Sequence, residues 1–477
     1  MQKQKIRKPL LYLQIAKNIE VLINNEVLRV GEKLPSIRMV CREQGVSMST
    51  AQLAYFELES KSLIEPRPKS GYYVSQSFKQ NLELPSTSKP ENRLLKSSPQ
   101  NLVAKVYDTI GEKNITQFSL GIPANEFLPV PKLNKAMLQA MRELEGSGTG
   151  YEKSEGNSKL RRHIARWSFN WNGKLTEHDI ITTSGCLNAI TYCMMAICKR
   201  GDWIAVESPV YFGILQLAES LGLKIIELPT HPKTGIEMDA FKKMLATKNV
   251  KAVLLVSNFN NPLGSCMPDE HKKEAVRLIS NYGVPMIEDD LYGDLYFGSS
   301  RPKSCKTFDE EGLVLWCGSV SKTLAPGYRV GWVAPGKYYD EIKNLKLLQS
   351  ISSATLTQEA VANFFETGRY ESHLRKLRHT LHTNCLQYIR AISEYFPKGT
   401  KVSRPQGGLF LWVEMNKKIN AVDLYEKAII NKISIAPGNM FTLQSQFRNC
   451  MRLSYALPWD EKLECSLKLL GKLANEI

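Results

Sequence analysis

No stretch of the sequence approaches the roughly 20 consecutive apolar residues that a membrane-spanning helix needs. The first residues are basic, but no apolar signal-peptide core follows them. The ten cysteines are scattered, with no CxxC pair and no His/Cys group at metal-ligand spacing. Such cysteines are typical of apolar positions or free thiols in a reducing compartment. These absences predict a cytoplasmic protein with no membrane segment and no metal.

The chain is long and its charge is uneven. A length of 477 residues is typical of two or three domains, and an apolar fraction of 43% is ordinary for a globular protein. The formal charge is +16, and residues 1–80 hold 13 Lys and Arg against 7 Asp and Glu. This first segment is therefore about three times as basic per residue as the rest. The charge favours a polyanionic partner, although a solvated basic face has the same composition.

The first 75 residues have the pattern of a small helical domain. Apolar residues recur at helical spacing over residues 11–23, 35–44 and 47–58, and serines stand at the expected N-caps. Gly45 separates the last two predicted helices, which is the pattern of a helix-turn-helix. The alternating residues 63–74 predict a β-hairpin with a basic tip.

The start of the third predicted helix carries short polar side chains, which can approach phosphates and base edges in a major groove. Nearby arginines and lysines add cations for the DNA backbone. A helical packing module with no ligand would show the same periodicity. The residues predicted to contact DNA are Arg38, Ser47, Met48, Ser49, Thr50, Gln52, Arg67, Lys69 and Gly71.

Residues 33–38, 45–50 and 71–74 resemble, in order and spacing, the GntR-type winged helix-turn-helix. The resemblance implies double-stranded DNA as a partner. Met48 stands where that family commonly has an arginine. This departure leaves the affinity or the preferred DNA sequence open, but not the fold.

Residues 76–115 are rich in serine, proline and charge, with few apolar residues. Such a composition cannot bury enough surface to fold independently. It predicts a flexible linker between residues 1–75 and 116–477, spanning on the order of 30 Å.

In residues 116–477, short apolar runs alternate with amphipathic helical patterns. This pattern predicts an α/β fold with a largely parallel sheet, in which ligands bind at the carboxyl ends of the strands. The predicted strands include residues 203–206, 224–228, 252–256, 284–287 and 313–317.

The segment 318–331 follows one of these strands and contains Lys322 on a turn of small residues. A partly desolvated lysine has a lowered pKa, and its neutral amine can form a Schiff base with an aldehyde cofactor. Ser319, Ser321 and Arg329 add hydroxyl donors and a cation that suit a phosphate monoester. A lysine on such a loop is more often a surface residue, so other strand ends must support this interpretation.

Four other predicted strand ends carry suggestive residues. The turn at Gly185 opens a helix whose first N–H groups can bind phosphate. Tyr211 can stack on a flat ring, Asn261 lies in an amide-rich turn, and Asp289 can keep a pyridine nitrogen protonated. Each of them taken singly is also typical of an ordinary turn or core residue.

Taken in order, these segments resemble the cofactor site of fold type I, class I and II aminotransferases (transaminases) over nearly all of residues 118–470. The resemblance implies pyridoxal 5'-phosphate (PLP) as cofactor and Lys322 as the catalytic residue that bonds to it. It implies cofactor binding by Gly185, Cys186, Leu187, Tyr211, Asn261, Asp289, Tyr292, Ser319, Ser321, Lys322 and Arg329.

The same resemblance assigns individual roles. Gly185 and Cys186, with Ser319 and Arg329, would bind the phosphate, and Tyr211 would stack on the ring. The ring hydroxyl oxygen would be held by Asn261 and Tyr292, and the ring nitrogen by Asp289.

Two further residues carry implied roles outside this set. Tyr151 matches the tyrosine that reaches the phosphate of the neighbouring subunit, which implies a homodimer. Arg452 matches the arginine that clamps the substrate carboxylate, for which a planar guanidinium is well suited. Residues 405–412 and 436–438 also fit the family's small C-terminal α/β subdomain.

The combination of both modules resembles the MocR group of bacterial transcriptional regulators. It implies a head-to-tail dimer in which PLP, with or without an amino acid or amine effector, shifts the arrangement of the DNA-binding domains. The alternative is an active aminotransferase with a DNA-binding appendage, in which the amine of Lys322 removes the substrate Cα proton. A third hypothesis is a sensor of PLP alone, against which Arg452 argues because such a sensor has less need of a carboxylate clamp.

Overall fold

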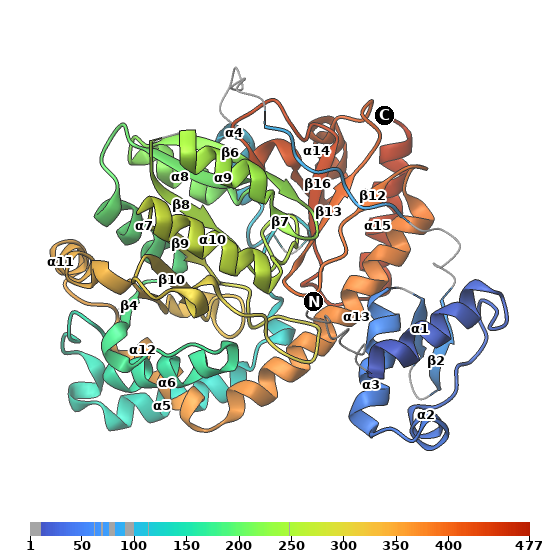
Figure 1. Cartoon of the computed structure of the whole chain (residues 1–477), viewed down its shortest axis with the longest axis horizontal. Helices are drawn as coiled ribbons and strands as arrows, with labels where there is room; N and C mark the ends of the chain where they lie inside the picture. The colour runs from blue at the N-terminus through green and yellow to red at the C-terminus, as the bar shows by residue number, and fades with distance from the viewer. Residues whose placement is uncertain are drawn as a thin grey trace, which may run out of the picture. The chain divides into compact units, whose positions relative to one another are not determined.

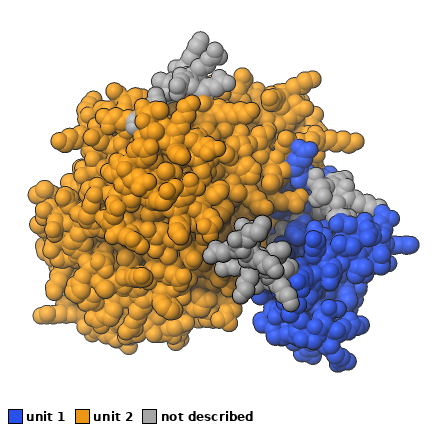
Figure 2. Space-filling view, in the orientation of Figure 1, with its two compact units in different colours: residues 1–83, 386–394 blue, residues 84–385, 395–477 orange. Residues whose placement is uncertain are grey.

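The computed structural model describes residues 11–61, 63–67, 70–75, 82–90, 100–112, 114–247 and 249–477. Figure 1 shows the course of the chain. It divides into two compact units, which comprise residues 1–83 with 386–394 and residues 84–385 with 395–477 (Figure 2). Among the described residues, no helix is long and apolar enough to cross a membrane, and no group of His, Cys, Asp and Glu could hold a metal ion.

The first unit has the predicted winged helix-turn-helix pattern. Its elements are α1 (Leu11–Asn24), α2 (Ile37–Gln44), α3 (Met48–Ser60) and the antiparallel strands β1 (Ile64–Arg67) and β2 (Gly71–Val74). The hydroxyl of Ser36 caps α2, and Gly45 ends that helix in the left-handed conformation, with φ 63°. Ser47 caps α3 by accepting a hydrogen bond from the amide of Thr50 at 3.2 Å. The unit's core includes the fully buried Tyr55, which donates a hydrogen bond to the carbonyl of Pro35 at 2.6 Å.

The second unit is built around an eight-stranded sheet. The strands are β4 (Ile181–Thr183), β5 (Trp203–Ser208), β6 (Lys224–His231), β7 (Gly235–Ile236), β8 (Val250–Leu255), β9 (Met286–Asp289), β10 (Val314–Ser319) and β11 (Gly331–Ala334). Their order is β4-β11-β10-β9-β8-β5-β6-β7. The strands from β10 to β6 are mutually parallel, whereas β11, β4 and β7 pair antiparallel. This arrangement confirms the predicted α/β fold with a largely parallel sheet.

Helices surround this sheet (Figure 1). They are α5 (Val130–Glu143), α6 (Ser158–Ser168), α7 (Cys186–Ile197), α8 (Phe212–Ser220), α9 (Met238–Thr247), α10 (Asp269–Tyr282), α11 (Tyr339–Ser350) and α12 (Thr355–Glu366). Successive residues of the buried strand β8 point to opposite sides, as a pleated strand requires. Ala252 and Leu254 belong to a core with α7, whereas Val253 and Leu255 belong to a core with α9 and α10.

A second, smaller sheet follows towards the end of the chain. Its antiparallel strands, in spatial order, are β12 (Lys401–Val402), β13 (Phe410–Glu414), β16 (Cys450–Ser454) and β15 (Ala436–Pro437). The helices in this part of the chain are α13 (Arg369–Tyr395), α14 (Ala421–Ile430) and α15 (Glu461–Asn475). The short strands β3 (Thr116–Gln117) and β14 (Ile433–Ser434) form a separate parallel pair. These elements are the small C-terminal α/β subdomain that the resemblance implied.

Two described stretches inside the expected linker, residues 82–90 and 100–112, make contacts that the expectation of a flexible linker did not include. The amide of Ser86 donates to the carboxylate of Glu414 at 2.6 Å, and the hydroxyl of Ser88 accepts from the amide of Thr230 at 2.7 Å. Farther on, α4 (Gln100–Tyr107) buries Val103 and Val106. The composition predicted too little apolar area for folding alone, but Ser86 and Ser88 find hydrogen-bond partners in the second unit, and Val103 and Val106 are buried there.

Candidate cofactor site

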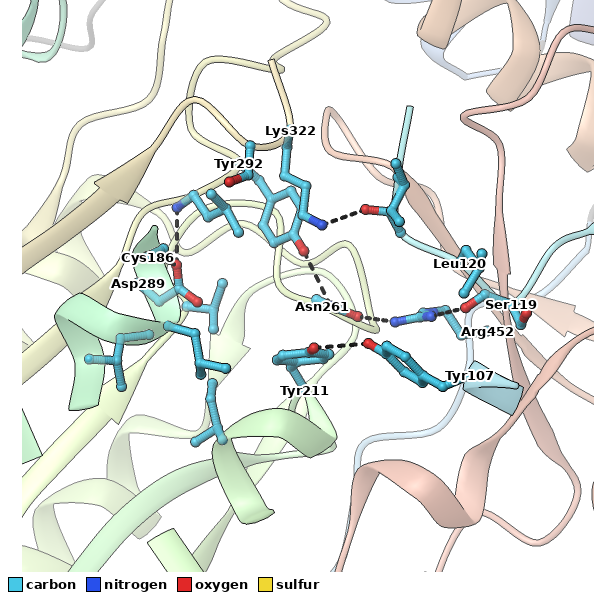
Figure 3. Close-up of a pocket in the computed structure, with 18 of the residues that line it drawn as sticks. Tyr107, Ser119, Leu120, Cys186, Tyr211, Asn261, Asp289, Tyr292, Lys322 and Arg452 are labelled. Atoms are coloured by element: carbon cyan, nitrogen blue, oxygen red, sulfur yellow. Dashed lines mark hydrogen bonds between the residues drawn. The ribbon is translucent and has the colours of Figure 1, made fainter. Parts of the chain in front are cut away.

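A cavity of about 200 Å³ lies where β8, β9 and β10 of the large sheet end (Figure 3). It is also bordered by the start of α7, by β16 of the small sheet, by α4 and by residues 119–122. The predicted site residues among its lining are Cys186, Leu187, Tyr211, Asn261, Asp289, Tyr292, Ser321, Lys322, Arg329 and Arg452. The fold therefore brings together side chains that are up to 266 residues apart in the sequence, from Cys186 to Arg452.

Lys322 lies on the turn after β10, and its Nζ donates a hydrogen bond to the carbonyl of Gly121 at 2.6 Å. Burial lowers the pKa of this amine to about 8. The positive charges of Arg452 and Arg329 lower the pKa further, whereas Asp289 opposes them. At this pKa roughly a tenth of the Lys322 amine is uncharged at pH 7, and this neutral form is the one that attacks an aldehyde.

An anion-binding corner forms where α7 begins. Gly185 precedes the helix with φ 98°, and the guanidinium of Arg329 donates to the carbonyl of Ser184 at 2.9 Å. A Cβ atom added to Gly185 would collide with Nη2 of Arg329, and the positive φ also favours glycine at this position. The helix N-terminus, the guanidinium and the hydroxyl of Ser321 together suit a phosphate group.

Ser319 lies behind this corner and is absent from the cavity lining. Its hydroxyl accepts a hydrogen bond from the amide of Ser321 at 3.0 Å and donates to the carbonyl of Val330 at 2.9 Å. It therefore holds the turn that carries Lys322.

Asp289, the last residue of β9, is a buried carboxylate at the base of the cavity. It accepts hydrogen bonds from the amide of Leu291 at 3.2 Å and from the thiol of Cys186 at 3.3 Å. Burial raises the pKa of Asp289 to about 6, and no ion pair with it forms among the described residues. A cationic ring nitrogen would supply the missing partner, which fits a protonated pyridine.

A hydrogen-bonded chain crosses the cavity (Figure 3). Asn261 donates to the hydroxyl of Tyr292 at 3.2 Å, and its carbonyl oxygen accepts from Nη1 of Arg452 at 2.8 Å. Nη2 of Arg452 donates to the carbonyl of Ser119. Arg452 is only 3% exposed, and its Nε has no partner within the described part of the chain. A buried guanidinium with a spare donor is suited to a carboxylate ligand.

Tyr211 precedes α8 and lines the cavity on the side opposite Lys322 (Figure 3). Its hydroxyl lies 3.1 Å from that of Tyr107, at the end of α4. Sequence reasoning missed Tyr107, because it lies in a range whose composition indicated a linker. The apolar spacing of Val103 and Val106 was the one available signal for a helix there.

Tyr151 does not line the cavity of its own chain, and its side chain is 84% exposed. Sequence reasoning also missed the segment Ser119–Ile122 and the apolar wall formed by Ile190, Ile214, Val256 and Leu291.

The predicted DNA-contacting residues lie in the first unit. Ser47, Met48, Ser49 and Gln52 are exposed at the start of α3, Thr50 is half-buried there, and Arg38 is exposed on α2. The hydroxyl of Ser47 lies 2.8 Å from those of Ser49 and Thr50. Gly71 opens β2 with φ 110°. The side chain of Arg67 and all of Lys69 are outside the described residues.

Comparison with protein families assigns both parts of the chain. Residues 115–467 match the aminotransferase class I and II family, and residues 11–74 match the bacterial regulatory proteins of the gntR family. The HTH-type transcriptional regulator YjiR of Escherichia coli is 37% identical, over 97% of this chain and 98% of its own length. YdcR, a regulator of the same type from that organism, is 33% identical over 98% of this chain and 99% of its own length.

Among solved structures, the α-aminoadipate aminotransferase LysN of Thermus thermophilus superposes with a TM-score of 0.72. It is 25% identical, and the match covers 80% of this chain and 99% of LysN. The LysN structure contains N-(5'-phosphopyridoxyl)-L-leucine.

The cofactor of this family fits the cavity. The corner at Gly185 and Arg329 suits a phosphate, Asp289 suits a ring nitrogen, and Lys322 suits an aldehyde. The predicted cofactor, PLP, is therefore confirmed by the family and matched by the residues present. The chain belongs to the class I and II aminotransferase family and, through its gntR-family winged helix, to the MocR-type transcriptional regulators that combine the two.

Proposed function

We propose that the second unit of this regulator recognises an amino acid or amine effector at its PLP and thereby alters how the first unit binds DNA in the cytoplasm. The observation that carries the proposal is the joint presence of Lys322 and Arg452 in one cavity. Lys322 offers a reactive amine, and the spare donor of Arg452 suits a carboxylate. A sensor of PLP alone would need only the first of these.

PLP supplies an aldehyde and an electron-withdrawing ring when it is bound. The chain's own residues then bind and orient the effector. Arg452 would hold its carboxylate, and the buried Asp289 would hold the proton on the ring nitrogen. The amine of Lys322, once released, is placed to take a proton from the effector's Cα.

We infer a homodimer with a head-to-tail arrangement as the regulatory form. The exposed Tyr151, which does not reach the cavity of its own chain, is consistent with a role at the cavity of a second copy. An effector can shift the arrangement only if it binds the competing states with different affinity. DNA must then change the effector's affinity by the same factor.

The test is an absorbance titration of the PLP-loaded protein with amino acids and simple amines, followed by measurement of DNA affinity with each. We expect some of these compounds to change both the spectrum and the DNA affinity. Sensing would be contradicted if none of the compounds changed the spectrum. It would also be contradicted if compounds changed the spectrum while the DNA affinity stayed constant with all of them.

An active aminotransferase is the second candidate function. The ten predicted site residues that line one cavity fit this function as well as sensing, whereas the relatives that span the whole chain are HTH-type transcriptional regulators. Assay for the keto product, with an added keto acid as the second substrate, separates the two. Repeated turnover would make the protein an enzyme first, whereas a single half-reaction fits a sensor.

The lowered pKa of Lys322 predicts a pH dependence for PLP capture. The cofactor-free protein should react at a rate that rises with pH and levels off above about 8, because the neutral amine is then the main form. Nα-acetyl-lysine, the control with a free side-chain amine, should instead have its midpoint near 10.4. The rate of absorbance change over a pH series measures both, and a protein midpoint near that of acetyl-lysine would contradict the burial of Lys322.

We expect Arg38, which is exposed on α2 of the first unit, to contribute to the salt dependence of the DNA affinity. Arg38→Gln should weaken binding to all DNA sequences, because it removes one phosphate contact. The slope of log affinity against log salt concentration should fall by about 0.9. Lys17→Gln, which removes an exposed charge from α1 instead, is the matched control. Equal slopes for the Arg38 variant and the native protein would show that α2 faces away from the phosphates.

A further inference from the structure

Tyr107 belongs to neither of the two family regions. The gntR-family match ends at residue 74 and the aminotransferase match begins at residue 115. Nevertheless, the side chain of Tyr107 forms part of the cavity wall. The segment that joins the DNA-binding region to the PLP-binding region therefore contributes directly to the ligand site.

The position of the Tyr107 hydroxyl within the cavity is specific. It lies 3.1 Å from the hydroxyl of Tyr211, and the Tyr107 ring meets Phe212 edge to face at 5.5 Å between centroids. Figure 3 shows the two hydroxyls pointing toward one another, with Arg452 beside them. Burial lowers the pKa of Arg452, and Tyr107 and Tyr211 are among the side chains close enough to oppose this shift. The hydroxyl of Tyr107 is thus on the effector side of the cavity, near the carboxylate-binding arginine.

The helix that carries Tyr107 is anchored to the same unit. Val106 is 1% exposed, and the hydroxyl of Thr109 donates to the side-chain oxygen of Gln117 in β3 at 3.1 Å. These contacts hold α4 against the small subdomain, so the Tyr107 hydroxyl is presented to the cavity by an ordered element.

We propose that Tyr107 is a specificity-determining residue whose hydroxyl contacts the carboxylate-bearing part of the effector. Through Tyr107, occupancy of the cavity acts on the joining segment itself. This inference rests on the proposed function. The contact favours ligands that carry a carboxylate within reach of both Arg452 and Tyr107. A phenol can donate a hydrogen bond to a carboxylate, whereas the alkyl chain of a simple amine offers no acceptor at this position.

The test compares two probes on the cofactor-free, full-length protein. N-(5'-phosphopyridoxyl)-L-leucine, the adduct present in the LysN structure, carries both the cofactor part and an amino acid carboxylate. Pyridoxamine 5'-phosphate carries the cofactor part alone. The ratio of their two affinities, measured by calorimetry, isolates the contribution of the amino acid part.

In Tyr107→Phe we expect this ratio to fall about 10- to 100-fold, the loss of one hydrogen bond to a charged group. The ring and its contact with Phe212 remain in this variant. Lys105→Gln is the matched control, because it alters α4 at an exposed ion pair outside the cavity and should leave the ratio unchanged. A ratio within twofold of the native value in Tyr107→Phe, or an equal fall in Lys105→Gln, would overturn the assignment of Tyr107.

Hydrogen–deuterium exchange of residues 100–112 tests the coupling to the joining segment. The leucine adduct should slow exchange there more than pyridoxamine phosphate does in the native protein, and this difference should vanish in Tyr107→Phe. Equal protection by the two probes in the native protein would overturn the coupling.

The outcomes separate this inference from the proposed function. If the ratio depends on Tyr107 but the adduct leaves DNA affinity unchanged, the ligand contact stands and sensing fails. If neither probe binds, the cofactor assignment fails and the inference is overturned with it.

Discussion

Lys322→Ala should abolish the visible absorbance that PLP gains when it bonds to the protein, while the protein still folds. No other cavity-lining lysine exists among the described residues, so no amine there can replace it. Reversible binding of the phosphate and ring should persist, because Arg329, Asp289 and Tyr211 are unchanged. We expect the PLP affinity to fall by at least 100-fold, since the covalent bond is lost.

A second lysine offers a matched control. Lys346 on α11 is also buried, and burial lowers its pKa to about 8 as well. Its Nζ lies 3.5 Å from the hydroxyl of Thr182, outside the cavity lining. Lys346→Met should therefore keep the visible absorbance. An unchanged spectrum in Lys322→Ala, or its loss in Lys346→Met, would show that a buried amine elsewhere bonds to the cofactor.

Arg452→Met should weaken the spectral response to amino acids on the order of 100-fold, the loss of a paired, charge-assisted contact. The loss also leaves the carbonyl oxygen of Asn261 without its 2.8 Å donor. The response to propylamine should change much less, because it has no carboxylate. Titration of both compounds measures the difference, and equal losses would show that Arg452 supports the cavity rather than the ligand.

The same variant also tests the cause of the lowered pKa of Lys322. The positive charge of Arg452 contributes to the lowered pKa of Lys322, after burial. In Arg452→Met the midpoint of PLP capture should therefore move to higher pH. A midpoint that stays at about 8 would show that the charge of Arg452 does not contribute to the lowered pKa of the amine.

The residues whose place at the cavity the sequence predicted are those at the ends of apolar strands. Asp289 and Lys322 each follow a recognisable buried run, and parallel strands place such residues at one edge of the sheet. The helix-turn-helix was predictable for a similar reason, because Ser36, Gly45 and Ser47 are local signals that act within a few residues.

The features that were missed depend on partners far away in the sequence. Tyr107 meets Tyr211 across 104 residues, and Ser86 meets Glu414 across 328. Composition describes a segment in isolation, whereas these residues become ordered only because the second unit provides partners for them. Ser319 is absent from the cavity lining, because local bonds to the Ser321 amide and the Val330 carbonyl engage its hydroxyl, and its contact with the phosphate stays a prediction.

The stretch from Ser86 to Ser88 joins the two sheets of the second unit. Ser86 is bonded to Glu414 at the end of β13, and Ser88 is bonded to Thr230 in β6. A recombinant fragment that began at residue 115, where the family match starts, would therefore lose the hydrogen bonds that Ser86 and Ser88 make to the two sheets. It would also lose Tyr107 from the cavity wall. The minimal autonomous form of the sensor should start before Leu84, and shorter fragments should bind effectors with altered selectivity.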